Sequence, residues 1–314
     1  MTTTHLALVG PTASGKSALA HSVAQELGDV EIVSVDSMQG YRGMDIGTAK
    51  PSVDEQATVV HHLLDIADPA DDLNVARYQS LARVVVADIA RRGKRALLVG
   101  GTGLYFQAVV DDLRFPGEDL ELRAAIERRT AEPGGIAAAY AELERLDPVA
   151  ASRIDPHNAR RIVRALEVIE LTGEPFSSFG PGVQTHGPTA FPVSIAGTWL
   201  PRAVLATRIG ERVAAMRRRG LRAEVERLRG LPAWSRTARQ AIGYKEILGV
   251  LDDAGTEDVD RRAEDAAFET IARRTRSFAR RQRMWFRRDP RIAWVGTAEN
   301  PCGSERAVLA LWRR

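Results

Sequence analysis

The sequence has little of several features that define other protein classes. Its 314 residues include one cysteine, Cys302, which excludes an internal disulfide and a zinc site built from several cysteines. No apolar run approaches the length of a membrane-spanning helix, and residues 1–5 lack the basic segment that begins a signal peptide. We find no internal repeat. These absences predict a cytoplasmic globular protein with no membrane partner.

Charge is unevenly distributed along the chain. Residues 1–192 contain 18 Lys and Arg against 26 Asp and Glu, a net charge of −8. Residues 193–314 contain 26 against 15, a net charge of +11, and nearly all of these basic residues are arginine. Arginine forks onto phosphates and stacks on bases, so the asymmetry fits a polyanionic partner on one side. An arginine-rich solvated surface would give the same composition.

One stretch near the beginning has a specific chemistry. It consists of Gly10, Pro11, Thr12, Ala13, Ser14, Gly15, Lys16 and Ser17. This is the spacing of a P-loop, and it lies between an apolar run, 6–9, and a helix-like segment, 18–27. Glycines let backbone N–H groups wrap an anion at a helix N-terminus, Lys16 adds a point charge, and Ser17 can hold Mg²⁺. The stretch predicts a di- or triphosphate site.

Two further apolar runs predict strands that end beside the P-loop. Residues 31–35, expected to form the neighbouring strand, lead into Asp36, and residues 95–99 lead into a glycine-rich turn at Thr102. Parallel strands present their carboxyl ends at one edge, where ligands bind. Asp36 is therefore either a general base near a leaving phosphate or a metal-binding or helix-capping carboxylate. The third strand ends without the Walker B aspartate of ordinary ATPases.

The strand–helix alternation stops between residues 114 and 192. Helix-like segments separated by Pro and Gly take over, which predicts a helical insertion into a sheet domain formed by residues 1–113 and 193–314. Within the insertion, Arg160 and Arg164 lie one turn apart on a helix face. That face either carries surface ion pairs or contacts phosphates.

The last part of the chain is predicted to be helical and rich in arginine. Eight arginines lie between residues 273 and 288, with Phe278, Trp285 and Phe286 among them. Such aromatic residues are either core contacts or platforms for base stacking. Together the elements predict an α/β fold: a P-loop NTPase-like parallel sheet core, a helical insertion domain and an arginine-rich helical C-terminal part.

Seven blocks, in unbroken order from the first strand to about Arg288, resemble one family. They are GPTASGKS at 10–17, VDSMQGYRGMDIGTAKP at 35–51, HHLLDI at 61–66, LVGGTGLYF at 98–106, RRIVRALE at 160–167, GYKE at 243–246 and RRQRMWFRR at 280–288. The family is that of the bacterial tRNA dimethylallyltransferases, also called isopentenyl-diphosphate:tRNA isopentenyltransferases. Seven collinear blocks are far more specific than the P-loop alone.

The resemblance implies transfer of a dimethylallyl group from dimethylallyl diphosphate to N6 of the adenosine immediately 3′ of the anticodon. Residues 10–17 would hold the diphosphate, with Thr12 in contact with it, Mg²⁺ at Ser17, and Lys16 stabilising the leaving charge. Asp36 would accept the proton of the adenine amine. An arginine of the 208–212 helix would also hold the pyrophosphate, and Arg212 is favoured over Arg208. The implied catalytic residues are Asp36, Lys16 and Arg212.

The resemblance also implies where tRNA is bound. A stacked adenine cannot reach a buried carboxylate, so the base must be flipped into a channel. The implied tRNA contacts are Asp36, Ser37, Met38, Gln39, Thr102, Arg123, Arg160, Arg161, Arg164, Gln240, Gly243, Tyr244, Lys245, Arg280, Arg281, Gln282, Trp285 and Arg287. The family often has glutamine where Arg160 stands, which favours phosphate contact over base reading there. The expected partner is the anticodon stem-loop, and a monomer is expected.

Two other functions fit parts of the sequence. The opening strand–loop–helix unit alone also fits a P-loop kinase of a small metabolite, and the basic half fits an RNA-stimulated NTPase. The helical insertion, the arginine-rich second half and the missing strand-end acid disfavour the kinase. Phosphoryl transfer without tRNA would indicate a kinase, whereas ATP turnover stimulated by RNA would indicate the NTPase.

Overall fold

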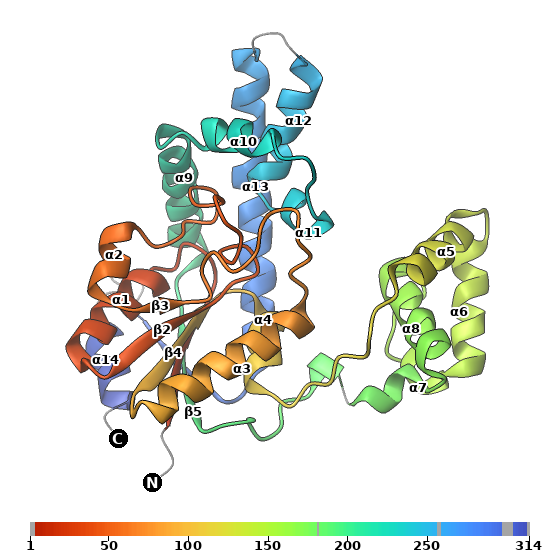
Figure 1. Cartoon of the computed structure of the whole chain (residues 1–314), viewed down its shortest axis with the longest axis horizontal. Coiled ribbons are helices and arrows are strands. Elements are labelled where there is room, and N and C mark those ends of the chain that lie inside the picture. Colours follow the sequence, from red (N-terminus) through yellow and green to blue (C-terminus); the bar gives the residue numbers. More distant parts are fainter. Residues whose placement is uncertain (1–3, 181, 256–258, 297–303, 313–314) are drawn as a thin grey trace. The chain divides into compact units, whose positions relative to one another are not determined.

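The chain folds into two compact units. The computed structural model describes residues 4–180, 182–255, 259–296 and 304–312, so Cys302 lies outside the described residues. One unit comprises residues 1–111 and 188–314, and the other comprises residues 112–187 (Figure 1). No helix in the described ranges has both the length and the apolar character needed to cross a bilayer.

The larger unit is built on a six-stranded parallel sheet of order β3-β2-β4-β1-β5-β6. Its strands are β1 (His5–Val9), β2 (Val30–Val35), β3 (His61–His62), β4 (Arg95–Gly100), β5 (Val193–Thr198) and β6 (Ile292–Val295). The central strands are buried on both faces and mostly apolar, as strands of helix-covered parallel sheets are.

The prediction that β2 neighbours the P-loop strand is wrong, because β4 lies between β1 and β2. The connection through the P-loop helix leaves a gap of one strand between β1 and β2, and β4 later fills this gap. The register pairs Gly100 with both Val9 and Val35, so all three strands end at one level. Asp36 therefore still lies on the same edge as the P-loop.

Helices cover both faces of this sheet. On one face α1 (Lys16–Leu27) and α14 (Glu305–Trp312) pack on Leu6, Leu8 and Leu97. On the other, Val9, Val33 and Leu98 belong to a larger core with α3 (Val75–Arg91), α4 (Gly103–Val110), α9 (Arg202–Arg218) and α13 (Arg261–Phe286). The short α2 (Val53–Thr58) begins with a capping box formed by Ser52 and Glu55.

Helix α13 is the longest element, with 26 residues. Its apolar face, with Phe268, Ile271 and Phe286, is buried, and most of its arginines lie on the opposite face, which is exposed. The helix packs against α4, α9 and α12. The small helices beside it are α10 (Leu221–Arg229), α11 (Arg236–Arg239) and α12 (Tyr244–Ala254).

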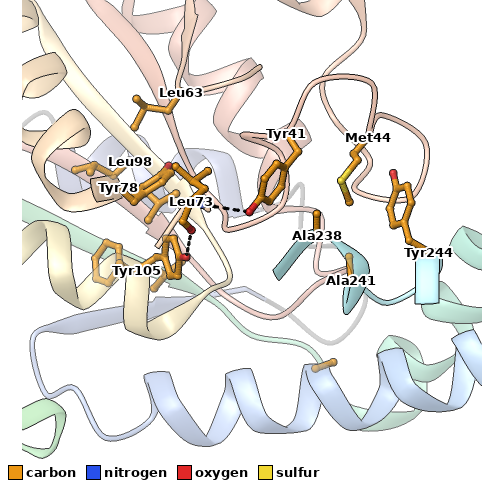
Figure 2. Packing of buried hydrophobic residues seen from close by; sticks show 14 of the residues in the cluster. Tyr41, Met44, Leu63, Leu73, Tyr78, Leu98, Tyr105, Ala238, Ala241 and Tyr244 are labelled. Atoms are coloured by element: carbon orange, nitrogen blue, oxygen red, sulfur yellow. Dashed lines mark hydrogen bonds between the residues drawn. The ribbon is translucent and has the colours of Figure 1, made fainter. Parts of the chain in front are cut away.

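A group of tyrosines fixes the chain around the carboxyl end of β2. Figure 2 shows Tyr41, Tyr78 and Tyr105 gathered around Leu73. The Leu73 N–H donates to the Tyr41 hydroxyl at 3.4 Å, and the Tyr105 hydroxyl donates to the Leu73 carbonyl at 2.9 Å. The Tyr78 hydroxyl donates to the carbonyl of Ser34, two residues before Asp36. The rings fill the core while every phenol oxygen has a partner.

The smaller unit is helical. It contains α5 (Leu120–Ala131), α6 (Gly135–Leu146), α7 (Pro148–Ala151) and α8 (Ala159–Thr172), followed by the 3₁₀ turns η1 (Phe176–Phe179) and η2 (Gly182–Gln184). Ile126, Leu143, Ile162 and Leu166 form its separate core.

Candidate active site

The phosphate loop joins β1 to α1 and is shaped to receive an anion. Gly15 precedes α1 with a φ of 86°, and no side chain caps the first turn, so its N–H groups can bind a ligand. Gly10 passes so close to Thr198 that a Cβ there would clash. The buried Ser14 hydroxyl is hydrogen-bonded to the Thr198 hydroxyl at 2.7 Å, so the Ser14 side chain anchors the loop.

A cavity of about 350 Å³ adjoins this loop and combines polar and apolar walls. Its polar lining includes Thr12, Lys16, Ser17, Asp36 and Arg212. Its apolar lining includes Val213, Met216, Ala241, Ile242, Ile271 and Phe278. These walls suit a ligand with a diphosphate at one end and a short hydrocarbon at the other.

Two cations and one carboxylate interact at the polar wall. Burial and the nearby Arg212 guanidinium lower the pKa of Lys16 to about 8, while Asp36 opposes this change. Burial also lowers the pKa of Arg212, and Asp36 again opposes the change. The Lys16 ammonium has one distant acceptor, the Pro11 carbonyl at 3.4 Å. A bound anion would relieve the repulsion between the two cations.

A second cavity, of about 500 Å³, also adjoins the phosphate loop. Arg212 lines both cavities, whereas Arg208 lines the second and is not among the residues lining the first. Of the two arginines, Arg212, which the resemblance favours, is thus the one that lines the first cavity together with Asp36.

Asp36 follows β2 and is held by its own turn. One oxygen, Oδ1, accepts the Met38 N–H at 2.8 Å and the Gln39 N–H at 3.4 Å. The other, Oδ2, makes no hydrogen bond with any residue in the described ranges, and the half-buried carboxylate lines the cavity. A carboxylate fixed by one oxygen with the other free has the form of a general base.

The loop after Asp36 is ordered by polar contacts. The Gln39 amide donates to the carbonyls of Thr48 and Ala49 at 3.3 and 3.2 Å and accepts the Ser34 hydroxyl at 2.7 Å. The buried Lys50 ammonium donates to Asp45 and Asp65, both at 2.6 Å. These bonds close residues 36–51 over the edge of the sheet.

Glu224 is an important residue that sequence reasoning missed. Its buried carboxylate accepts N–H groups of residues 45–47 at 2.8 to 3.2 Å and the Tyr244 hydroxyl at 2.6 Å. Burial, together with the Glu224 carboxylate, raises the pKa of Tyr244. The sequence did contain a signal for a buried glutamate, because Glu224 lies on the apolar stripe formed by Leu221, Val225 and Leu228.

Several residues predicted to contact tRNA line the cavity, and others lie elsewhere. The cavity is lined by Ser37, Met38, Gln39, Gln240, Tyr244, Arg281 and Gln282. Thr102 precedes α4 and Gly243, with a φ of 100°, precedes α12. The Lys245 ammonium donates to the Gln240 amide oxygen at 2.7 Å, and the half-buried Trp285 packs against Gly103. Arg280, Arg281 and Arg287 are exposed on or just after α13.

Two of these residues have side chains already engaged in the protein. The Tyr244 ring is fully buried, and its hydroxyl donates to Glu224. The Gln282 amide is 5% exposed and bridges the phosphate loop and the turn after β4. In this structure neither polar group is available to RNA.

The predicted arginines of the smaller unit divide into two kinds. Arg123 and Arg164 pair with the fully buried Glu167 at 2.8 and 3.0 Å. Although burial opposes it, the two guanidinium groups hold the pKa of Glu167 below its ordinary value. Arg160 and Arg161 are exposed and form no ion pair with any residue described by the structure. Their charges are thus available for another molecule.

The sequence of the chain matches a protein-family model and known relatives. The family model described as IPP transferase matches residues 39–289. The chain is 48% identical over 305 residues to the tRNA dimethylallyltransferase of Bifidobacterium longum subsp. infantis, covering 96% of this chain and 88% of that protein. It is 49% identical over 315 residues to the tRNA dimethylallyltransferase of Kineococcus radiotolerans, covering 98% and 95%.

Solved structures show the same fold. The full-length tRNA isopentenylpyrophosphate transferase of Bacillus halodurans aligns with a TM-score of 0.67 at 36% identity, covering 99% of this chain and 97% of that one. A eukaryotic dimethylallyltransferase described as acting on tRNA aligns with a TM-score of 0.75 at 26% identity, covering 93% and 73%. The predicted α/β fold with a P-loop sheet core is confirmed.

Proposed function

The chain belongs to the IPP transferase family, and on that premise we propose that it transfers a dimethylallyl group from dimethylallyl diphosphate to tRNA. The acceptor is N6 of the adenosine immediately 3′ of the anticodon, and the products are N6-isopentenyladenosine and diphosphate. The observation that carries the proposal is a cavity that combines a phosphate loop, a fixed carboxylate and an apolar wall. The phosphate loop suits the diphosphate, the carboxylate can accept the amine proton, and the apolar wall suits the five-carbon chain.

The phosphate loop stabilises the leaving group. As the allylic C–O bond breaks, its electron pair moves onto the diphosphate oxygen, and negative charge increases there. Lys16, Arg212 and the free N–H groups at the start of α1 face that charge. Oriented donors and cations in a partly buried site stabilise such charge more than water does.

Asp36 completes the chemistry at the nucleophile. The bond between adenine N6 and the allylic carbon forms while an N6 proton passes to the free oxygen, Oδ2. The adenine amine is a weak nucleophile because its lone pair is delocalised into the ring. Removal of this proton increases the electron density on N6 as the new bond forms. General-base help of this kind contributes about 10²–10⁴ in rate.

The donor set fits a magnesium ion that accompanies the diphosphate. The Ser17 hydroxyl lines the cavity and makes no hydrogen bond with the residues that the structure describes. Within the described ranges there is no cluster of three or more His, Cys, Asp or Glu side chains that would hold a metal by themselves. Hard oxygen ligands from one hydroxyl, substrate phosphates and water are what Mg²⁺ prefers. Ser17 would hold it, and the ion would neutralise diphosphate charge.

The arginine-rich surfaces supply the RNA contacts in this proposal. Backbone phosphates are bound by exposed arginines of both units. These are Arg280, Arg281 and Arg287 in the larger unit and Arg160 and Arg161 in the helical insertion. The target base leaves its stack and enters the cavity, where Asp36 faces it. We further propose that the protein acts as a cytoplasmic monomer.

The test is a prenyl-transfer assay with purified protein, Mg²⁺, dimethylallyl diphosphate and tRNA that lacks the modification. We expect mass spectrometry of the nucleosides to show one added isopentenyl group on the adenosine next to the anticodon. The control RNA has guanosine at that position and should stay unmodified. Phosphoryl transfer from ATP to a metabolite, or RNA-stimulated ATP turnover without prenylation, would refute the proposal.

A further inference from the structure

Gln282 links the long basic helix to the phosphate loop. It lies on the buried face of α13, and its amide is used on both sides. Oε1 accepts the Thr12 N–H at 2.8 Å, across 270 residues of sequence, and Nε2 donates to the Gly101 carbonyl at 2.8 Å. One side chain thus joins α13, the phosphate loop and the turn after β4.

The surrounding backbone is shaped for this bridge. A Cβ at Gly101 would lie 2.5 Å from Gln282 Nε2, so the turn approaches the amide only because glycine stands there. On its other side the phosphate loop is held by the hydrogen bond between the Ser14 and Thr198 hydroxyls. The loop is therefore fixed at two points, one of them supplied by α13.

We infer that Gln282 is a positioning residue for the diphosphate rather than a contact to RNA, and this inference rests on the proposed function. It acts through Thr12, which lines the cavity. Holding the Thr12 N–H fixes the first half of the loop, so that the N–H groups of its second half point at the diphosphate. An amide is required because it donates and accepts at once.

The inference separates two roles on one helical turn. Arg280 is exposed two residues before Gln282 and lines neither cavity, so its guanidinium can face a phosphate. The Gln282 amide has no exposed polar group left to offer. Replacing Gln282 should therefore affect the diphosphate and leave RNA binding unchanged, whereas replacing Arg280 should do the reverse.

The experiment compares Gln282→Met with the wild type. We measure kcat and the KM for dimethylallyl diphosphate at saturating tRNA, and separately the tRNA Kd by filter binding. Two lost hydrogen bonds, one to the diphosphate loop, should raise the KM about tenfold and lower kcat, with the tRNA Kd within about twofold of wild type. Gln79→Met is the matched control, because the Gln79 amide donates to the Ala108 carbonyl at 2.7 Å without lining either cavity.

Gln282→Glu provides an independent readout in case the methionine variant folds poorly. An ionised glutamate keeps the acceptor for Thr12 but loses the donor to Gly101, and a protonated one regains it. Its KM, divided by the wild-type KM at each pH, should therefore fall as pH is lowered. A flat ratio, a wild-type KM in Gln282→Met, or weakened tRNA binding with an intact KM would each overturn the inference. Failure of the proposed function differs, because the wild type itself would transfer nothing.

Discussion

Lys16, Arg212 and Asp36 show how single residues set the properties of the site. Lys16 and Arg212 line a partly buried wall together with Asp36. Burial, and then repulsion from Arg212, lower the pKa of Lys16. A diphosphate would supply the missing negative charge. It would therefore favour the protonated form of Lys16 and raise its pKa above the value of the free protein.

This linkage predicts the pH dependence of substrate affinity. In the protein without ligand the pKa of Lys16 is about 8, and a bound diphosphate should raise it. Diphosphate affinity should be full below about pH 8 and should fall as pH rises toward the pKa of the bound form. The measurement is the KM for dimethylallyl diphosphate between about pH 7 and 9.5. Lys16→Arg, which does not titrate there, should lose this dependence, and an unchanged profile would contradict the assignment.

The general-base role of Asp36 predicts a selective loss of turnover. Asp36→Asn keeps an oxygen that can accept the Met38 N–H, so the turn and the RNA surface should persist. Turnover should drop about 10²–10⁴-fold while tRNA affinity changes little. Single-turnover assays and filter binding measure the two quantities. An active asparagine variant would remove Asp36 from the base role.

At the scale of elements, the loop of residues 36–51 is the part least evident from periodicity. Its path depends on Glu224 of α10, whose carboxylate gathers three backbone N–H groups and the Tyr244 hydroxyl. Sequence patterns showed the glycines of the loop but could not show this partner, because α10 lies far along the chain. The missed helix α4 has a related cause. It is buried almost all round, so no amphipathic period marks it.

Glu224→Gln should destabilise the protein. Loss of the charged acceptor leaves buried N–H groups less well satisfied, at a cost of about 1–3 kcal/mol. Urea unfolding followed by circular dichroism measures it. Glu226→Gln is the control, since Glu226 is exposed two residues away and pairs with Arg222, and should change stability by less than about 0.5 kcal/mol. If the two variants changed the free energy of unfolding equally, the hydrogen bonds of Glu224 would not contribute to stability as proposed.

At the scale of the whole molecule, basic charge is concentrated in the second part of the sequence, and exposed arginines of α13 display part of it. Binding of tRNA by this surface predicts a steep fall of affinity with salt, because bound arginines release counterions. Arg280→Gln or Arg287→Gln should each reduce the slope of log K against log salt by about 0.7–0.9. Arg262→Gln, at the other end of α13, is the matched control and should leave the slope unchanged. If the tRNA affinity of the wild type did not depend on salt, the arginines of α13 would be ruled out as the tRNA-binding surface.

Local sequence determined the strands β1, β2 and β4, the phosphate loop, the helix after it and the family, because apolar periodicity and glycine spacing act over a few residues. It also placed Asp36 on the correct edge, since parallel strands end together even when another strand lies between them. Tertiary structure alone decided that Arg212 faces the cavity, that Arg123 and Arg164 pair with Glu167, and that Gln282 holds Thr12. These are partnerships between residues distant in sequence. Packing, which no local pattern records, chooses among the possible partners of each polar side chain.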